Sequence, residues 1–431
     1  MLLVLCSIVM IIEGFDIYMI GQIAPAIAQG LGEDATGFIK VFLLQQVGLA
    51  VGGFVVSPFS DQYGRKPLLI FCAIAFGLLT LAALAVTSLL QLAALRGLAG
   101  LFLAGVVPNA LALLTETTPA RHRSTFVAIA FAGFVLGSGL AALIALFLLG
   151  DYGWQSCFVI GGLLPLLCVP LCILFVDESV PFMLRRNSSD VRIAPALYKI
   201  APDVDLSATL LAPIGAGVRP GGSEAADGGL GRVFAPKWIG LTLLLWGGYF
   251  LSVGEISMLA SWSTTFFNKL AGVSVQAYAA TNLLYVAGSL IGTVSAGFLL
   301  DRFRRTQVML ILPLVAVLAV ALVGSVPFGG AASKAVFFAW GFSQNGAQSA
   351  LNVICALAYP TAIRSTGVGW SFAMGRVGSI VGPLLGGGAL AFAFSLQQIY
   401  FAAAAAQLII AIFMLALARR LAKRLADTGG R

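Results

Sequence analysis

Charged residues are scarce in this chain. Asp, Glu, Lys and Arg make up 10% of the 431 residues, there is a single histidine, and hydrophobic residues make up 60%. Soluble domains carry about 25% charged residues. The shortage of charge therefore excludes an ordinary soluble domain and indicates a protein that is embedded in a lipid bilayer.

Signatures of enzymes are also missing from the sequence. It has no HExxH, GxSxG or P-loop pattern and no CxxC pair. The six cysteines lie in apolar segments without metal or disulfide spacing, so we expect them to act as small apolar filler. We therefore expect no enzymatic activity, no metal and no cofactor. Without a nucleotide-binding motif, any transport must be driven by an ion or substrate gradient.

Long apolar runs dominate what is present. About 20 apolar residues suffice to cross a bilayer, and on that criterion the sequence predicts twelve transmembrane helices. Their approximate spans are 2–28, 36–58, 67–87, 90–115, 124–149, 154–176, 238–262, 275–300, 306–326, 333–358, 365–391 and 397–419. The predicted fold class is an all-α membrane protein.

One long polar interval divides the predicted helices into two sets of six. It covers residues 177–237 and includes a glycine-rich stretch, which is typical of a linker. We therefore predict an N-terminal half at 1–176, a linker loop at 177–237 and a C-terminal half with a basic tail at 238–431.

Positive charge predicts the orientation of the chain. Most of the 25 Lys and Arg residues lie on one side, in loops 59–67, 118–124, 177–237, 301–306 and 359–364 and in the tail 419–431. Since cytoplasmic loops carry the excess of Lys and Arg, we expect both termini in the cytoplasm of a bacterial cell and the protein in its inner membrane. The net charge of +8 then reflects topology and attraction to lipid headgroups. We expect no nucleic-acid partner, and we expect a monomer.

The two halves resemble each other internally. At an offset of 240, residues 60–66 align with 300–306, and at an offset of 241, residues 119–125 align with 360–366. Matching loops in nearly the same register predict structural repeats. Transporters built from such repeats hold their substrate between the halves, near the middle of the membrane.

Two carboxylates interrupt the first apolar run. Glu13 and Asp16 share one helix face and lie roughly 16–21 Å from the start of the helix, near the bilayer midplane. Each carboxylate there costs about 2.5–3.5 kcal/mol, so intramembrane acids are usually functional. We expect both to couple transport to protons, because burial disfavours the charged form of a carboxyl group. The alternative is a pair neutralised by a neighbouring basic group for packing alone.

An arginine in the eleventh predicted helix lies at the same depth. Arg376 follows Arg364 by roughly 18 Å along the helix. A guanidinium binds a carboxylate bidentately, so we expect Arg376 to hold the carboxylate of a substrate. The alternative is a permanent salt bridge to Asp16, and the two can coexist if the substrate displaces the bridge. Arg364 is either a cytoplasmic topology charge or a gate.

Polar and aromatic residues on neighbouring helices complete the predicted site. Asn345, Gln348 and Asn352 form one stripe, whose amides suit hydrogen bonds either to substrate or between helices. Further candidates are Asn282 and Tyr285 in helix 8, and Trp246 and Tyr249 in helix 7. The last two either wall an aromatic ring or serve packing.

Other charges suggest conformational networks. We expect Arg96 and Glu116, at opposite ends of helix 4, to pair across the halves. We expect Glu255 near the outer end of helix 7, where it is either a solvated vestibule residue or a coupling group. The loop residues Asp61, Arg65, Lys66, Asp301 and Arg305 are predicted to form a latch that pairs across the cytoplasmic ends when the carrier faces outward.

Several of these motifs resemble known families. Asp61–Lys66 is similar to the D-x-x-G-R-K loop of the major facilitator superfamily, and Arg96–Gly100 to its helix 4 pattern. Glu13–Asp16 resembles the D-G-F-D of the aromatic acid:proton symporters, with Glu13 in place of Asp. Asn345–Gln348, Tyr359–Trp370 and Gly375–Pro383 match the helix 10–11 run of that family closely.

The resemblance implies a twelve-helix carrier that imports an aromatic or similar small carboxylate together with protons by alternating access. It favours roles for Arg376 and Arg364 in function. A single proton per anion would leave transport electrically neutral, and a second would add about 2.3 kcal/mol per 100 mV. The alternatives are a porter of another organic anion or a sugar, a drug exporter, and a transporter-like receptor.

Overall fold

The structure is a computed structural model that describes residues 2–56, 59–118, 123–179, 182–183, 233–359 and 361–429. Side chains are described for all of these except residues 61, 123–125, 128, 356–357, 361–362, 364–365 and 422–429. Most of the predicted linker, 177–237, thus lies outside the described residues.

Long helices account for nearly all of the described chain. They are α1 (Leu2–Leu31), α2 (Phe38–Val55), α4 (Arg65–Ala82), α5 (Leu89–Thr117), α6 (Arg123–Phe147), α8 (Gln155–Phe175), α14 (Ile239–Ala271), α15 (Val275–Arg302), α16 (Arg305–Val323), α17 (Ala331–Ala358), α18 (Thr361–Ala391) and α19 (Leu396–Gly429). Short helical turns, α3 (Phe59–Tyr63), α7 (Leu149–Tyr152), η1 (Ala35–Gly37) and η2 (Ala83–Ala85), lie between them.

Ten of these helices are long and apolar enough to cross a membrane, counted over the described residues. The other two long helices, α17 and α18, carry the predicted substrate-binding amides and Arg376. The predicted all-helical membrane fold is confirmed.

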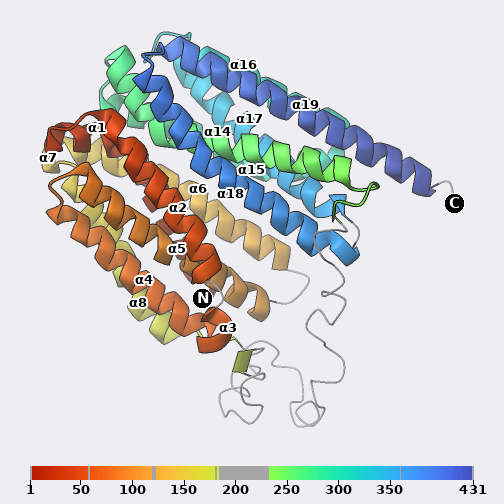
Figure 1. Ribbon diagram of the computed structural model, residues 1–431, viewed down its shortest axis with the longest axis horizontal. Coiled ribbons are helices and arrows are strands. Elements are labelled where there is room, and N and C mark those ends of the chain that lie inside the picture. Colours follow the sequence, from red (N-terminus) through yellow and green to blue (C-terminus); the bar gives the residue numbers. More distant parts are fainter. Residues whose placement is uncertain are drawn as a thin grey trace.

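The helices form two groups that lie side by side (Figure 1), α1 to α8 in red to yellow and α14 to α19 in green to blue. In the first group α1 packs on α6, α2 on α5 and α4 on α8. In the second, α14 packs on α18, α15 on α17 and α16 on α19. These pairings are equivalent helix by helix, as expected of a structural repeat.

Glycines allow the closest of these helix pairs to form. A Cβ atom on Gly382 of α18 would lie 2.1 Å from the carbonyl oxygen of Gly254 in α14, and one on Gly378 would lie 2.1 Å from that of Phe250. In the first half, a Cβ on Gly137 would lie 2.1 Å from the carbonyl of Ile11. Small residues let membrane helices approach until their backbones touch.

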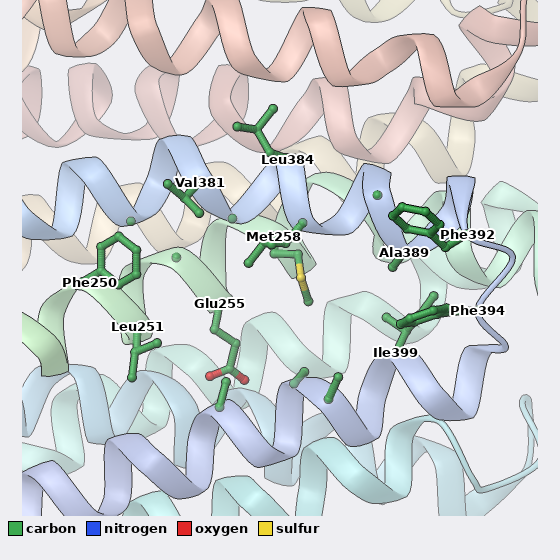
Figure 2. A pocket seen from close by; sticks show the side chains of 18 residues that line it. Phe250, Leu251, Glu255, Met258, Val381, Leu384, Ala389, Phe392, Phe394 and Ile399 are labelled. Carbon is green, nitrogen blue, oxygen red and sulfur yellow. The ribbon is translucent and has the colours of Figure 1, made fainter.

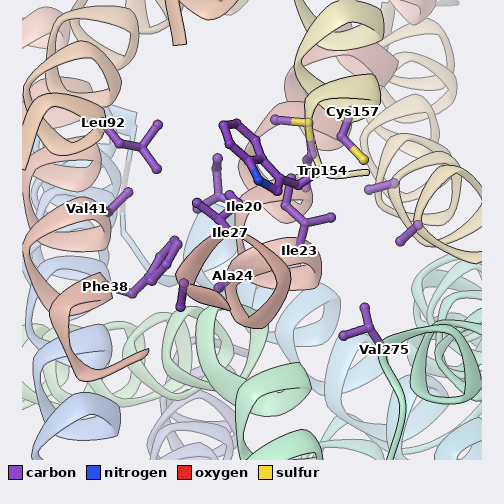
Figure 3. Packing of buried hydrophobic residues seen from close by; sticks show 14 of the residues in the cluster. Ile20, Ile23, Ala24, Ile27, Phe38, Val41, Leu92, Trp154, Cys157 and Val275 are labelled. Carbon is purple, nitrogen blue, oxygen red and sulfur yellow. The ribbon is translucent and has the colours of Figure 1, made fainter. Parts of the chain in front are cut away.

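One hydrophobic cluster joins the two halves. It contains residues of α1, α2, α5, α6 and α8 together with residues of α14 and α15 (Figure 3). Specific contacts reinforce it: Gln46 donates a hydrogen bond to Ser257 at 2.8 Å, and the Phe42 and Trp262 rings meet edge to face at 5.2 Å.

The end of the bundle away from this cluster is called the basic end, because Arg65, Lys66, Arg302 and Arg305 lie at helix ends there and Arg419 lies near the end of the apolar part of α19. Two further clusters near this end each stay within one half. The halves are therefore joined away from the basic end.

Polar side chains midway along the second half are open toward the basic end. Arg376 and Asn352 are both exposed, although Arg376 lies near the middle of α18 and Asn352 lies six residues before the end of α17. Intramembrane polar groups face water-filled space rather than lipid. We therefore expect water beside these two side chains.

The glycine contacts give a stability prediction. Gly382→Ala should destabilise the folded protein by about 1–3 kcal/mol, because backbone atoms of α14 must move. Gly388→Ala in the same helix is the matched control, since nothing lies within 4 Å of its Cβ position. Thermal unfolding midpoints in one detergent compare the two. Equal midpoints would contradict close α14–α18 packing.

Candidate functional site

A buried ion pair fixes the middle of the first half. Arg96 of α5 donates to both carboxylate oxygens of Asp16 in α1, one of these bonds being 2.8 Å long. Both side chains are 1% exposed. The bidentate geometry satisfies the carboxylate in the way that compensates charge best at this depth.

This pairing corrects two predictions. Arg96 pairs within the first half and not across the halves. The alternative of a salt bridge from Arg376 to Asp16 is wrong here, because Arg96 already occupies both oxygens. Glu116 also pairs within its own half, with Arg65 Nη2 at 3.1 Å. The physical reason is helix packing. Because α5 contacts α1 directly, Arg96 of α5 lies within hydrogen-bonding distance of Asp16.

Glu13 and Arg376 are left facing each other across the halves. Glu13 on α1 is 7% exposed, and its charge interacts with that of Arg376 on α18. Neither side chain forms a hydrogen bond or ion pair with another described side chain. The exposed guanidinium therefore has donors available for an incoming anion, with a carboxyl group near enough to compete for it.

The α17 amides fall into two hydrogen-bonded groups. Toward the basic end, Gln348 accepts a bond from Ser252 at 2.5 Å and donates to Asn352 at 3.1 Å. The hydroxyl of Tyr249 donates to the same Asn352 oxygen at 2.8 Å. The Tyr249 ring itself is fully buried, so in this conformation only its hydroxyl reaches the site, through Asn352.

The second group lies one turn further from the basic end. Asn345 donates to the hydroxyl of Tyr285 at 3.1 Å and to that of Ser289 at 2.8 Å. Tyr285 in turn donates to Gln344 at 3.2 Å. These bonds tie α15 to α17, so Asn345 and Tyr285 also act between helices.

A small pocket lies between the halves next to this second group. It is lined by Tyr18, Gln22, Ser138, Leu259, Ala260, Thr264, Tyr278, Asn282, Tyr285, Val286 and Trp340. Its volume of about 20 Å³ has room for about one water molecule. An aromatic substrate would have to enter from the open basic side and push this pocket apart.

Sequence analysis missed Tyr18 and Gln22, the two residues that α1 supplies to this pocket. They follow Gly14 at spacings of four residues, so they share one helix face. The i, i+4 spacing of Gly14, Tyr18 and Gln22, a line of small and polar residues along a mostly apolar helix, is the signal that would have found them.

Glu255 corrects a further prediction. It lies in the middle of α14, buried at 6% exposure, rather than near the outer end. The helix continues nine residues past the predicted end at 262, through Thr264, Thr265 and Asn268, because those polar residues pack inside the bundle.

Trp246 lies on the open side of α14. Its ring stacks on that of Trp370 at 5.9 Å between centroids and meets Phe234 edge to face at 5.3 Å. Trp370 is 40% exposed. The pair thus presents an aromatic surface toward the basic end from α14 and α18.

The basic end of the first half holds a network that sequence analysis did not foresee. Glu178, just after α8, accepts bonds from the backbone N–H groups of Arg65 and Lys66 and so caps α4. Ser179 donates to Glu116, which also pairs with Arg65. A carboxylate at a helix N-terminus is favoured by the helix dipole.

The predicted latch is only partly described. The side chains of Asp61 and Arg364 lie outside the described part of the chain. Asp301 and Arg305 are exposed, and Lys66 donates to the carbonyl of Ile173 at 2.8 Å. In a carrier open at this end, the latch would be parted.

Two equivalent bundles, open on one side and with unpaired charges facing each other at mid-depth, define a multi-pass membrane carrier. The sequence model of the Major Facilitator Superfamily matches residues 6–383 and 245–430. The chain belongs to the Major Facilitator Superfamily, and it is accordingly a transporter rather than an enzyme.

Characterised transporters are similar over most of the chain. A gallate transporter of Pseudomonas putida is 33% identical over 403 residues, 93% of this chain and 87% of that protein. The 4-hydroxybenzoate transporter PcaK of Acinetobacter baylyi is 32% identical over 95% of this chain and 90% of its own. A 3-(3-hydroxy-phenyl)propionate transporter of Escherichia coli is 30% identical over 95% and 92%.

Solved structures share the fold. A bacterial homologue of the lysosomal transporter Spinster, inward-facing and unoccupied, superposes with a TM-score of 0.72 at 17% identity and covers 98% of this chain and 97% of its own. The xylose transporter XylE of Escherichia coli, in an inward open conformation, gives 0.72 at 14% identity, covering 96% and 94%.

The ion pair leads to a second stability prediction. Asp16→Asn should destabilise the protein by about 3–5 kcal/mol, because Arg96 is left buried without a counter-charge. The double variant Asp16→Leu with Arg96→Leu should recover most of that loss, since a buried pair is often replaceable by apolar residues. Unfolding in detergent measures all three proteins. A double variant that is at least as destabilised as Asp16→Asn would contradict the pairing.

Proposed function

We propose that this transporter imports an aromatic monocarboxylate together with protons. The observation that carries the proposal is the exposed, unpaired guanidinium of Arg376, at mid-depth and opposite Glu13. The substrate class is supported by the similarity to gallate, 4-hydroxybenzoate and hydroxyphenylpropionate transporters. Aromatic carboxylates share the two features that the site addresses, an anionic head and a flat ring.

Arg376 binds the substrate carboxylate. A guanidinium offers two parallel donors to a carboxylate, and no described side chain competes at bonding distance. Trp246 and Trp370 offer ring faces on the path from the basic end, so they suit an aromatic ring that approaches Arg376 from that side.

The amides and hydroxyls around Arg376 select among aromatic acids. Gln348, Asn352 and Tyr249 lie on one side, and Asn345, Tyr285 and Asn282 on the other. Such groups donate to and accept from phenolic hydroxyls. A substrate whose ring hydroxyls leave one of these groups buried without a partner binds more weakly, because an unsatisfied buried polar group costs about 1–3 kcal/mol.

Glu13 carries the coupling proton. When it is ionised, its charge attracts Arg376 and competes with substrate. When it is protonated, Arg376 is free to bind the anion, so proton and substrate enter together. Asp16 binds a coupling proton only if Arg96 pairs with another group during the transport cycle, because Arg96 otherwise donates to both Asp16 oxygens.

Alternating access follows from rocking of the two halves. The basic end is cytoplasmic by the charge rule, which places both termini inside a bacterial cell and the protein in its inner membrane. In the outward-facing state that end is closed by a latch, which consists of Asp61, Arg65, Lys66, Asp301, Arg305 and Arg364. When the latch is parted, Arg65 pairs with Glu116 instead. The chain works as a monomer without a nucleic-acid partner.

Arg376 gives the first test. Arg376→Lys should weaken binding of 4-hydroxybenzoate about 10- to 100-fold, the range expected when hydrogen bonds to a charged group are lost. Ligand-induced thermal stabilisation of purified protein measures the affinity. Arg419→Gln, which removes an exposed arginine at the end of α19, is the control and should bind normally.

Three outcomes would contradict this part of the proposal: unchanged affinity in Arg376→Lys, stabilisation by xylose and not by aromatic acids, or binding without uptake in proteoliposomes. The last would indicate a receptor.

Glu13 gives the second test. Glu13→Gln should still exchange substrate across proteoliposomes but should lose accumulation driven by a pH gradient, which for one proton is about tenfold per pH unit. Glu13→Asp, which keeps a carboxyl group, is the control and should accumulate substrate. A Glu13→Gln protein that concentrates substrate as well as the parent would overturn the assignment.

A further inference from the structure

Glu255 is an acidic group that the proposed cycle does not use. It lies midway along α14 and is 6% exposed. Its Oε1 atom accepts one hydrogen bond, from Gln344 at 3.3 Å, and its Oε2 atom has no partner. A carboxyl group that is buried at this depth without a second bond calls for an explanation.

No described cation forms an ion pair with Glu255. Among the positively charged side chains described on α1, α15, α17, α18 and α19, only Arg376 lies near the middle of its helix. Arg376 precedes Gly378, the residue that contacts Gly254, by two positions, or about 200° around α18.

The other ionisable groups described on the surrounding helices include the carboxyl groups of Glu13 and Asp16 on α1, the thiol of Cys355 on α17, and several phenols, among them Tyr18 on α1. Tyr285 of α15 connects to Glu255 through Gln344, Tyr400 of α19 donates to Ser263 at 2.9 Å, and Tyr249 of α14 donates to Asn352. None of them supplies a positive charge.

The surroundings on the other side are apolar. Glu255 borders a cavity of about 550 Å³ between α14, α18 and α19. Figure 2 shows it as a carboxylate among Phe250, Leu251, Met258 and other apolar side chains, and it is the only lining residue with a polar side chain. An ionised carboxylate there is strongly disfavoured, whereas a protonated one is not.

A directed chain of hydrogen bonds joins Glu255 to the substrate site. Asn345 donates to Tyr285 at 3.1 Å, Tyr285 donates to Gln344 at 3.2 Å, and Gln344 donates to Glu255 at 3.3 Å. Every donor points toward the carboxylate, and such chains strengthen cooperatively. Tyr285 also lines the pocket between the halves, which has room for about one water molecule next to the chain.

We propose that Glu255 binds a second coupling proton, whose binding is linked to that of the substrate through Asn345, Tyr285 and Gln344. Without substrate, the donor chain lowers the free-energy cost of ionising Glu255 in its apolar surroundings, so that the proton can be released. A substrate that takes the Asn345 donor for itself weakens the chain, and Glu255 takes up a proton from water. By reciprocity, the proton then favours substrate binding.

The consequence is electrical, and it rests on the proposed symport. One anion moving with protons on both Glu13 and Glu255 carries one net positive charge inward. Uptake then responds to the membrane potential, whereas uptake with a proton on Glu13 alone does not.

The experiment uses full-length protein in proteoliposomes, labelled 4-hydroxybenzoate, equal pH on both sides and a potassium diffusion potential of about 100 mV, negative inside. The parent protein should accumulate substrate up to about 50-fold, the ratio equivalent to about 2.3 kcal/mol for one net charge. Glu255→Gln should accumulate none under this potential, yet should retain counterflow and accumulation driven by a pH gradient. Asp151→Asn, an exposed acid at the opposite end, is the control and should respond to the potential.

The outcomes separate the two proposals. A parent protein that responds to a pH gradient but not to the potential overturns the role of Glu255 and leaves proton symport intact. A Glu255→Gln protein that still responds to the potential also overturns it. Failure of both driving forces in the parent protein overturns symport itself.

If Glu255→Gln shows no counterflow, Glu255→Asp, which keeps the carboxyl group, is measured as a second variant. Recovery of potential-driven uptake in Glu255→Asp supports the proposal. Recovery of counterflow alone overturns it. If neither recovers, Glu255 is needed for the cycle itself, and its assignment as a separate proton site falls.

Discussion

The cost of an unpaired charge in the middle of a membrane governs this structure. In the described part of the chain, the ion pair between Asp16 and Arg96 meets this cost most fully, because both carboxylate oxygens and two guanidinium nitrogens are paired and shielded from solvent, while the Nε atom of Arg96 has no partner. That pair removes Asp16 from competition for Arg376. Arg376 is consequently left with donors free, and Glu13 becomes the carboxyl group that it faces across the halves.

Packing turns this electrostatic arrangement into a carrier. Backbone contacts at glycines hold α14 against α18 and α1 against α6, so each half can move as a unit. The hydrophobic cluster away from the basic end is the joint on which the halves meet. The exposure of Arg376 gives it access to water, which allows its charge to exist without an ion-pair partner among the described side chains, whereas Glu13 is buried at 7% exposure.

Much of this arrangement could be predicted from the sequence, because helix length and depth follow from regular geometry. The rise per residue was enough to place Glu13 and Arg376 at one depth, and the repeat was enough to place them in opposite halves. The choice of partner was not predictable in this way, since Asp16 pairs with Arg96 through the rotation and contact of α1 and α5. Glu255 was misplaced because the polar residues that follow it hid the continuation of α14, and Gln344 lies one position off the predicted amide stripe.

The central claim is that a carboxylate can take Arg376 only when a proton takes Glu13. Counting protons as substrate binds tests it most directly. Purified protein in weakly buffered detergent solution, with a pH indicator and added 4-hydroxybenzoate, should take protons from the medium as the ligand binds, and Glu13→Gln should take up fewer. Binding of 4-hydroxybenzoate with no exchange of protons in the parent protein would contradict the account.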